Sequence, residues 1–259
     1  MRFLRSEGYF DSVNFFRIAL VERYARCMGT HLHIAHRGYR TGLGDNTLAQ
    51  IAEAIRLDCD MVEVDVRRRG SDGELVLAHE KGANLGAPLL RDALALARHA
   101  NIPLNLDLKQ NGLSEQLVRV LREGEMTDRV VLTGGGWEQA LWVRHLEPRI
   151  RIGFTIPRRH HDWVRALGWA ANRLWRFAWT GRVDLLMKAY RIDLVTIQHR
   201  LVTPKLVTQV HRGGGEIWVW TPDDPATIAR LCAMGVDGIC TNVPDPARVA
   251  ATQRTAIAA

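Results

Sequence analysis

The sequence lacks the features that mark several common protein classes. It has four cysteines in 259 residues and no C-x-x-C pair, so neither a zinc site nor a disulfide framework is expected. No run reaches the 18 or more uncharged apolar residues of a membrane span. Arg17 interrupts the N-terminal apolar run, and Glu7 and Asp11 precede it, so a secretory signal is not indicated. Repeats and low-complexity tracts are absent as well. We therefore expect a cytoplasmic globular protein.

The composition and length fit one large domain. Hydrophobic residues make up 47% of the chain and charged residues 24%, which is ordinary for a protein with a sizeable core. A (β/α)₈ barrel needs about 250 residues, close to the length of this chain. The formal charge of +7 favours an anionic partner: a phosphorylated substrate, a membrane surface or nucleic acid.

Short β-branched runs alternate with amphipathic stretches from residue 31 onward, which indicates βα units around a parallel sheet. Strands are predicted near 31–36, 60–66, 102–109, 129–133, 150–155, 192–198, 216–221 and 237–241. Helices are predicted near 45–57, 89–99, 114–124, 203–211 and 224–234. A hairpin is expected after the second strand, across Gly70 to Gly73. Eight strands predict a closed TIM (β/α)₈ barrel over residues 31–259, preceded by a helical extension, 1–30.

Two carboxylates stand out in the segment MVEVDV, residues 61–66. Side chains alternate between the faces of a strand, so the valines face the outer helices while Glu63 and Asp65 point into the barrel. These carboxylates are then roughly 6 to 7 Å apart, close enough to share one cation. Two unpaired buried negative charges would be costly, so a positive group is expected beside them.

The segment PLNLDLK repeats this pattern. Its leucines face outward, and Asn105, Asp107 and Lys109 face inward. Three inward carboxylates, those of Glu63, Asp65 and Asp107, would suit one hard divalent cation, Mg²⁺ or Ca²⁺, better than zinc. The alternative is a set of structural salt bridges to the many arginines.

Two histidines lie at predicted strand ends. His36 ends the first strand and is followed by Arg37 and by Gly38, which permits close backbone approach to a ligand. His79 ends the β run LAHE. Because imidazole titrates near neutral pH, acid and base roles are predicted for this pair. In EIWVWT, the alternation of side chains along the strand places Trp220 inside the barrel. There the indole would either line a substrate pocket or fill the barrel interior.

Six segments in order, HRGYRTGLGDNT, MVEVDV, DGELVLAHE, LNLDLK, IWVWTPDDP and GVDGICTNVPD, resemble the glycerophosphodiester phosphodiesterase family over residues 31–249. The resemblance implies a TIM barrel of the phospholipase C-like phosphodiesterase type. It implies hydrolysis of glycerophosphodiesters to glycerol 3-phosphate and an alcohol. The implied residues are the catalytic His36 and His79, the metal ligands Glu63, Asp65 and Asp107, and the substrate contacts Arg37, Lys109 and Trp220. The resemblance does not decide whether the nucleophile is water or a neighbouring substrate hydroxyl. It also does not decide which histidine is the base and which is the acid.

The sequence departs from the family pattern at several positions. Asp45 stands where the family usually has Glu, Glu80 replaces the usual Asp after the second histidine, and Asp107 replaces a usual Glu, as in the related sphingomyelinase D type. The subdomain that many members insert after the second histidine is missing. A more open pocket is therefore expected, and lysophospholipase D-like or sphingomyelinase D-like activity on membrane lipids is the alternative.

Most of the net positive charge of the chain comes from one segment, 157–191. It holds eight Lys or Arg residues against two Asp and so carries +6 of the net +7. Four tryptophans are interleaved with the basic residues, a pattern typical of helices that lie on anionic membranes. Peripheral contact with the inner membrane face is one interpretation, and an extended barrel helix with a solvated basic face is the other. A nucleic-acid-binding or non-catalytic anion-binding barrel is the least favoured reading, because it leaves three inward carboxylates unexplained.

Overall fold

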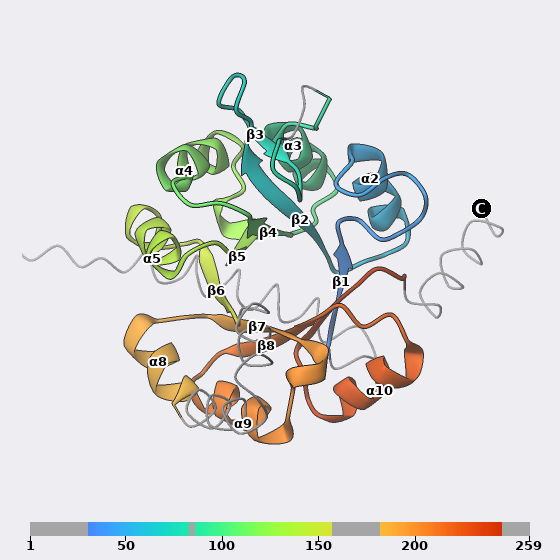
Figure 1. Ribbon diagram of the computed structural model, residues 1–259, viewed down its shortest axis with the longest axis vertical. Helices are drawn as coiled ribbons and strands as arrows, with labels where there is room; N and C mark the ends of the chain where they lie inside the picture. The colour runs from blue at the N-terminus through green and yellow to red at the C-terminus, as the bar shows by residue number, and fades with distance from the viewer. Residues whose placement is uncertain (1–30, 83–85, 157–181, 245–259) are drawn as a thin grey trace, which may run out of the picture.

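The computed structural model describes residues 31–82, 86–156 and 182–244, which form a closed (β/α)₈ barrel (Figure 1). The eight parallel strands are β1 (Leu32–His36), β2 (Met61–Arg68), β4 (Leu104–Leu108), β5 (Val130–Gly134), β6 (Arg151–Thr155), β7 (Leu194–Gln198), β8 (Glu216–Trp220) and β9 (Gly238–Thr241). They follow one another around the ring, and pairing of β1 with both β2 and β9 closes it. The eight predicted strands and the predicted fold class are confirmed.

The helices surround the strands, as Figure 1 shows. They are α2 (Leu48–Arg56), α3 (Leu90–His99), α4 (Ser114–Glu123), α5 (Trp137–Leu146), α8 (Val183–Tyr190), α9 (Pro204–Arg212) and α10 (Pro225–Ala233), with short 3₁₀ turns η1 (Thr127–Arg129) and η2 (His199–Leu201). Side chains of Thr47, Thr203 and Asp224 cap the first turns of α2, α9 and α10 by accepting backbone N–H groups. The five predicted helices are present.

A short strand, β3 (Leu75–Leu77), runs antiparallel to the end of β2, as the predicted hairpin requires. The chain then passes directly to α3 at Leu90, so no subdomain is inserted between them. This hairpin matters for the site because His79 follows β3 by only two residues.

Alternation along the strands builds two layers. The outward valines and leucines of β2 and β4 pack with the buried faces of α2 to α5. The outward valines and isoleucines of β7 to β9 pack with α8 to α10. Inside the barrel, an apolar plug fills the ring below the polar residues: Leu32, Ile34, Met61, Val131, Leu194, Trp218 and Cys240. The inward polar side chains therefore gather above this plug, at the carboxyl ends of the strands, where barrels of this kind carry their sites.

Two predicted regions lie outside the described residues. The N-terminal extension 1–30 is one, and most of the basic, Trp-rich segment is the other, apart from its last part, which includes α8. Within the described ranges, no helix has the length and apolarity that crossing a membrane would need.

Candidate active site

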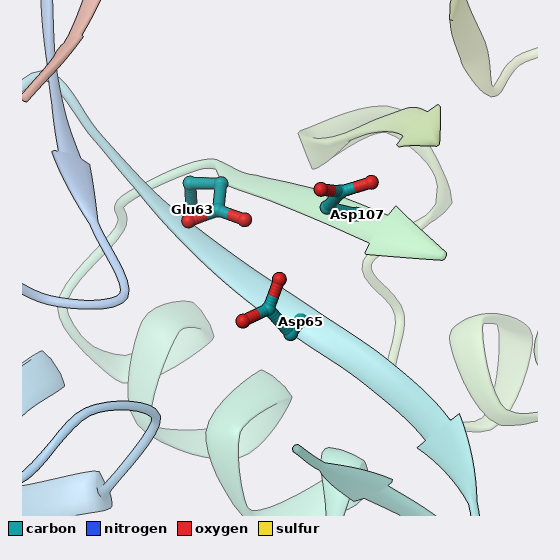
Figure 2. A group of neighbouring side chains, drawn as sticks. All are labelled: Glu63, Asp65 and Asp107. Atoms are coloured by element: carbon teal, nitrogen blue, oxygen red, sulfur yellow. The ribbon is translucent and has the colours of Figure 1, made fainter. Parts of the chain in front are cut away.

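Three carboxylates meet at the mouth of the barrel. Glu63 and Asp65 project from β2 and Asp107 from the neighbouring β4, and Figure 2 shows them turned toward one another. One oxygen of each lies within 4.8 Å of an oxygen of the other two. Glu63 and Asp65 are buried, whereas the Asp107 side chain keeps 23% of its surface exposed. The strand alternation read from the sequence thus brings these three acids together as predicted.

Asp65 is the most heavily contacted of the three. Its Oδ2 accepts a hydrogen bond from Asn46 Nδ2 at 2.9 Å and forms an ion pair with Arg37 Nε at 2.8 Å. Its Oδ1 lies 2.7 Å from Lys109 Nζ. Burial alone would raise the pKa of Asp65, but Lys109 and Arg37 outweigh burial and lower it. Asp65 is therefore held ionised.

Glu63 has the opposite electrostatic environment. Burial raises its pKa well above the ordinary value, and the charges of Asp65 and Asp107 raise it further. Its Oε2 accepts a hydrogen bond from the Arg37 backbone N–H at 3.0 Å. The cluster thus holds more negative charge than its own cations neutralise, so a further cation would be stabilised there.

The residues present fit a bound divalent cation. Asp65 Oδ1 is fully buried, and its side-chain partner in the described ranges is the Lys109 ammonium at 2.7 Å. A buried carboxylate oxygen needs positive charge beside it, which a divalent cation could supply in place of the ammonium. The donor set of carboxylate oxygens suits a hard ion such as Mg²⁺ or Ca²⁺.

Gly134, at the end of β5, makes room for Asp107. A Cβ atom at this position would lie 1.8 Å from Asp107 Oδ1, and the backbone has a φ of +67°. Only glycine combines this conformation with the absence of a side chain at low cost. The third carboxylate therefore depends on a glycine on the neighbouring strand.

His36 is positioned by residues far away in sequence. Asn242, which follows β9, donates through Nδ2 to Asp223 Oδ2 at 2.8 Å, so its Oδ1 faces His36. His36 Nδ1–H donates to that oxygen at 2.7 Å, which leaves the lone pair on Nε2 directed to the Glu63 side, 3.9 Å from Glu63 Oε2. Burial lowers the pKa of His36 despite the Asn242 bond, which raises it. The neutral form of His36 is thus favoured, and among the described residues no donor bonds to its Nε2.

His79 has a cationic partner instead. Arg37 Nη2 lies 2.7 Å from His79 Nδ1, and Asp65 Oδ2 lies 3.2 Å from the same nitrogen. Because a guanidinium can only donate, Nδ1 of the neutral ring accepts from Arg37, whereas Nδ1–H of the imidazolium would donate to Asp65. The ring proton of neutral His79 is then on Nε2, which lies 3.6 Å from the exposed Glu80 carboxylate. The two histidines therefore present opposite groups to the mouth: a lone pair on His36 and an N–H on His79.

Two residues near β1 have structural roles. Asn46 precedes Thr47, the N-cap of α2, and its own side chain donates to Asp65 and accepts from the Asp65 backbone N–H at 2.9 Å. Its φ of +58° is one that Asn tolerates better than most residues. Gly38 meets the backbone of Gln50, where an added Cβ would lie 2.8 Å from the carbonyl carbon, so helix α2, not a ligand, explains this glycine.

The opposite side of the mouth carries the predicted Trp220. It ends β8, packs against the apolar plug and faces inward, as parity predicted. His199, at the start of η2, lies with Nδ1 3.3 Å from the Trp220 carbonyl oxygen. The eight predicted site residues all lie at this end of the barrel, whereas Asn46, Asn242 and Asp223 were not predicted.

Comparison with known proteins identifies the family. The model of the glycerophosphoryl diester phosphodiesterase family matches residues 36–88 and 80–246. The chain belongs to this family. It is 24% identical to a glycerophosphodiester phosphodiesterase of Caldanaerobacter subterraneus over 83% of this chain and 95% of that protein. It is 26% identical to the probable glycerophosphodiester phosphodiesterase 2 of Mycobacterium tuberculosis over 84% and 89%.

Solved structures give the same fold. A glycerophosphoryl diester phosphodiesterase structure from Silicibacter pomeroyi superposes with a TM-score of 0.68 at 20% identity, over 89% of this chain and 94% of that one. An Oleispira antarctica phosphodiesterase, solved with its product sn-glycerol-3-phosphate, superposes with a TM-score of 0.66 at 19% identity, over 87% and 97%. As a family member, the present glycerophosphodiester phosphodiesterase is a phosphoric diester hydrolase.

Proposed function

We propose that this phosphodiesterase hydrolyses glycerophosphodiesters to glycerol 3-phosphate and an alcohol, with His36 as general base and His79 as general acid. The single observation that supports the assignment is the pair of Nδ1 contacts, from His36 to Asn242 Oδ1 and from Arg37 Nη2 to His79, which leaves a lone pair on His36 Nε2 and an N–H on His79 Nε2. Glu63, Asp65 and Asp107 hold one divalent cation, Mg²⁺ or Ca²⁺. When bound, this ion supplies positive charge against the phosphoryl oxygens.

The proton transfers balance in one turnover. His36 Nε2 takes the proton of the attacking oxygen, whether that oxygen belongs to water or to a neighbouring substrate hydroxyl, as the new P–O bond forms. The bond to the leaving alcohol breaks, and His79, which enters the step as the imidazolium, delivers its Nε2 proton to that alcohol oxygen. The ring is then neutral with its remaining proton on Nδ1, 3.2 Å from Asp65 Oδ2, and both histidines return to their starting forms by proton exchange with water. The Arg37 guanidinium and the Lys109 ammonium bind phosphoryl oxygens and stabilise the charge that develops on them. The Trp220 indole packs against the substrate.

A choline-release assay tests this function. The protein is incubated with glycerophosphocholine or lysophosphatidylcholine, each with Mg²⁺, Ca²⁺ or EDTA. We expect release from glycerophosphocholine with metal and none in EDTA. Equal release in EDTA would contradict the metal role, and release from lysophosphatidylcholine alone would establish the lysophospholipase D-like alternative. The direct passage from β3 to α3, without an inserted subdomain, is the observation that favours testing the lipid substrate.

Peripheral contact with anionic membranes is a separate part of the proposal. It derives from the basic, Trp-rich segment 157–191, of which 182–191 lies within the described ranges and includes α8. On α8, Leu185 and Tyr190 are 61% and 42% exposed, beside Lys188. Flotation with vesicles containing phosphatidylserine tests it: the protein is expected to float with these vesicles and not with neutral ones, and absence of binding to both would exclude it.

A further inference from the structure

Lys109 occupies an unexpected position for a residue whose proposed partner is a phosphate. Its Nζ lies 2.5 Å from Asp107 Oδ2 and 2.7 Å from Asp65 Oδ1. The ammonium thus lies between two of the three carboxylates. These contacts neutralise part of the cluster from within the protein.

The two oxygens of Asp65 differ in how easily they could take a metal ion. Oδ2 is engaged by Asn46, which is buried and bonded to Asp65 in both directions, and by Arg37. Within the described ranges, Oδ1 has one side-chain partner, the Lys109 ammonium at 2.7 Å. Freeing Oδ2 would break the pair of hydrogen bonds between Asn46 and Asp65. Freeing Oδ1 requires only that the long, flexible Lys109 side chain turn away.

We infer that Lys109 serves as an internal counter-cation of the acidic cluster, and that it leaves Asp65 Oδ1 when a divalent cation binds and pairs with the phosphate of the substrate or product. This deepens the proposed function and rests on it. Asp107, the other partner of the ammonium, is also a proposed ligand of the cation, so cation binding weakens both carboxylate contacts of Lys109. The ammonium is largely buried and then needs a new anionic partner, since an unpaired buried charge is costly. A phosphate monoester or diester supplies that partner. Cation binding and phosphate binding are therefore coupled, each strengthening the other.

The coupling is measured with Mn²⁺ as the probe, by the electron paramagnetic resonance signal of free Mn²⁺, with and without glycerol 3-phosphate. Wild-type protein, after removal of metal, is compared with Lys109→Met. Without glycerol 3-phosphate, Lys109→Met is expected to bind Mn²⁺ about tenfold more tightly, because no ammonium competes. In wild type, glycerol 3-phosphate tightens Mn²⁺ binding by about 5- to 150-fold, the usual span of coupled sites. In Lys109→Met this gain shrinks at least about fivefold.

Arg40→Met is the matched control. Arg40 is an exposed cation near the same mouth that makes no ion pair with the carboxylates within the described ranges. Its removal should change Mn²⁺ affinity by less than about twofold. A gain equal to that of Lys109→Met would mean that net charge alone acts and would overturn the inference. Equal Mn²⁺ affinities for wild type and Lys109→Met would also overturn the inference. An equal effect of glycerol 3-phosphate on the Mn²⁺ affinity of both proteins would do the same.

Two further measurements keep the test decisive. If Lys109→Met does not fold, Lys109→Gln replaces it, with the same expected order of affinities. A crystal structure with Mn²⁺ and glycerol 3-phosphate should show Lys109 Nζ turned from Asp65 Oδ1 to the phosphate; the ammonium still on Oδ1 would overturn the inference. Failure of the proposed function has a different signature, since wild type would then bind Mn²⁺ but release no choline from either substrate.

Discussion

The two sides of the barrel mouth orient their histidines in different ways. On the β2–β4 side, charged groups contact one another directly, and Arg37 fixes His79 while it pairs with Asp65. On the β8–β9 side, the neutral amide of Asn242 fixes His36 and is itself fixed by Asp223. The Arg37 cation beside Nδ1 of His79 leaves the proton of the neutral ring on Nε2. The amide oxygen of Asn242 draws the ring proton of His36 to Nδ1. In the proposed mechanism, the N–H of His79 therefore serves the acid and the lone pair of His36 serves the base.

The largest expected effect separates these two roles. His79→Ala should lower kcat for glycerophosphocholine by about 10² to 10⁴-fold, and His36→Ala by a similar factor. With a p-nitrophenyl leaving group, which departs without protonation, His79→Ala should recover most of its rate and His36→Ala should not. Steady-state kinetics on both substrates measure this. Recovery by His36→Ala instead would reverse the assignment of base and acid.

A smaller effect is expected from the amide that orients His36. Asn242→Leu should lower kcat by about 10- to 100-fold, a usual cost of losing a partner that orients a functional histidine, with KM little changed. Side-chain ¹⁵N resonances should show His36 losing its preference for the Nδ1–H tautomer. Thr208→Ala, which removes an exposed hydroxyl on α9, is the control and should leave both unchanged. An unaltered His36 tautomer in Asn242→Leu would contradict the positioning role.

Asn46 should matter for stability as well as for activity. Asn46→Ala removes both bonds to the buried Asp65 and should lower the free energy of unfolding by about 1–3 kcal/mol, the cost of leaving a buried polar group unpaired. Urea denaturation measures this change. Asp45→Ala, which loses only an exposed contact with Arg37, is the neighbouring control and should change stability by less than about 1 kcal/mol. Equal losses for the two variants would remove the special role of Asn46.

The smallest effect is a pH dependence that appears without metal. The folded protein raises the pKa of Glu63 above its ordinary 4.5, so above that pH the folded state retains a proton that the unfolded chain has lost. The contribution of Glu63 to stability should therefore be fully present below pH 4.5 and fall as pH rises toward the folded pKa, by at most about 1.4 kcal/mol per pH unit. Thermal melts in EDTA measure the slope. Glu63→Gln should flatten it, and a slope unchanged in that variant would assign it to another group.

The sequence was sufficient for the fold and for the acidic cluster, because both depend on local patterns. Alternation in MVEVDV and LNLDLK determines which side chains enter the barrel, and the ends of parallel strands meet at one face. Asn46 was missed because Asp-Asn-Thr before a helix has the composition of a cap, and only the structure separates the capping Thr47 from its neighbour.

Asn242 was missed for a different reason. It lies 206 residues from His36, and Asn before Val-Pro resembles an ordinary turn. Its place directly after the last barrel strand was the one available signal, since side chains there reach the mouth. Hydrogen-bond partners across such a separation depend on how the barrel closes, which local patterns do not encode.

Gly134 has a consequence for how this site could change over evolutionary time. Asp107 Oδ1 fills the volume that any side chain at residue 134 would need. The two positions lie on adjacent strands and should therefore be replaced together or not at all. A descendant that acquired alanine at 134 would lose its third acid unless residue 107 changed in the same lineage. The third carboxylate of the mouth is thus inherited through a pair of positions, one of which has no side chain.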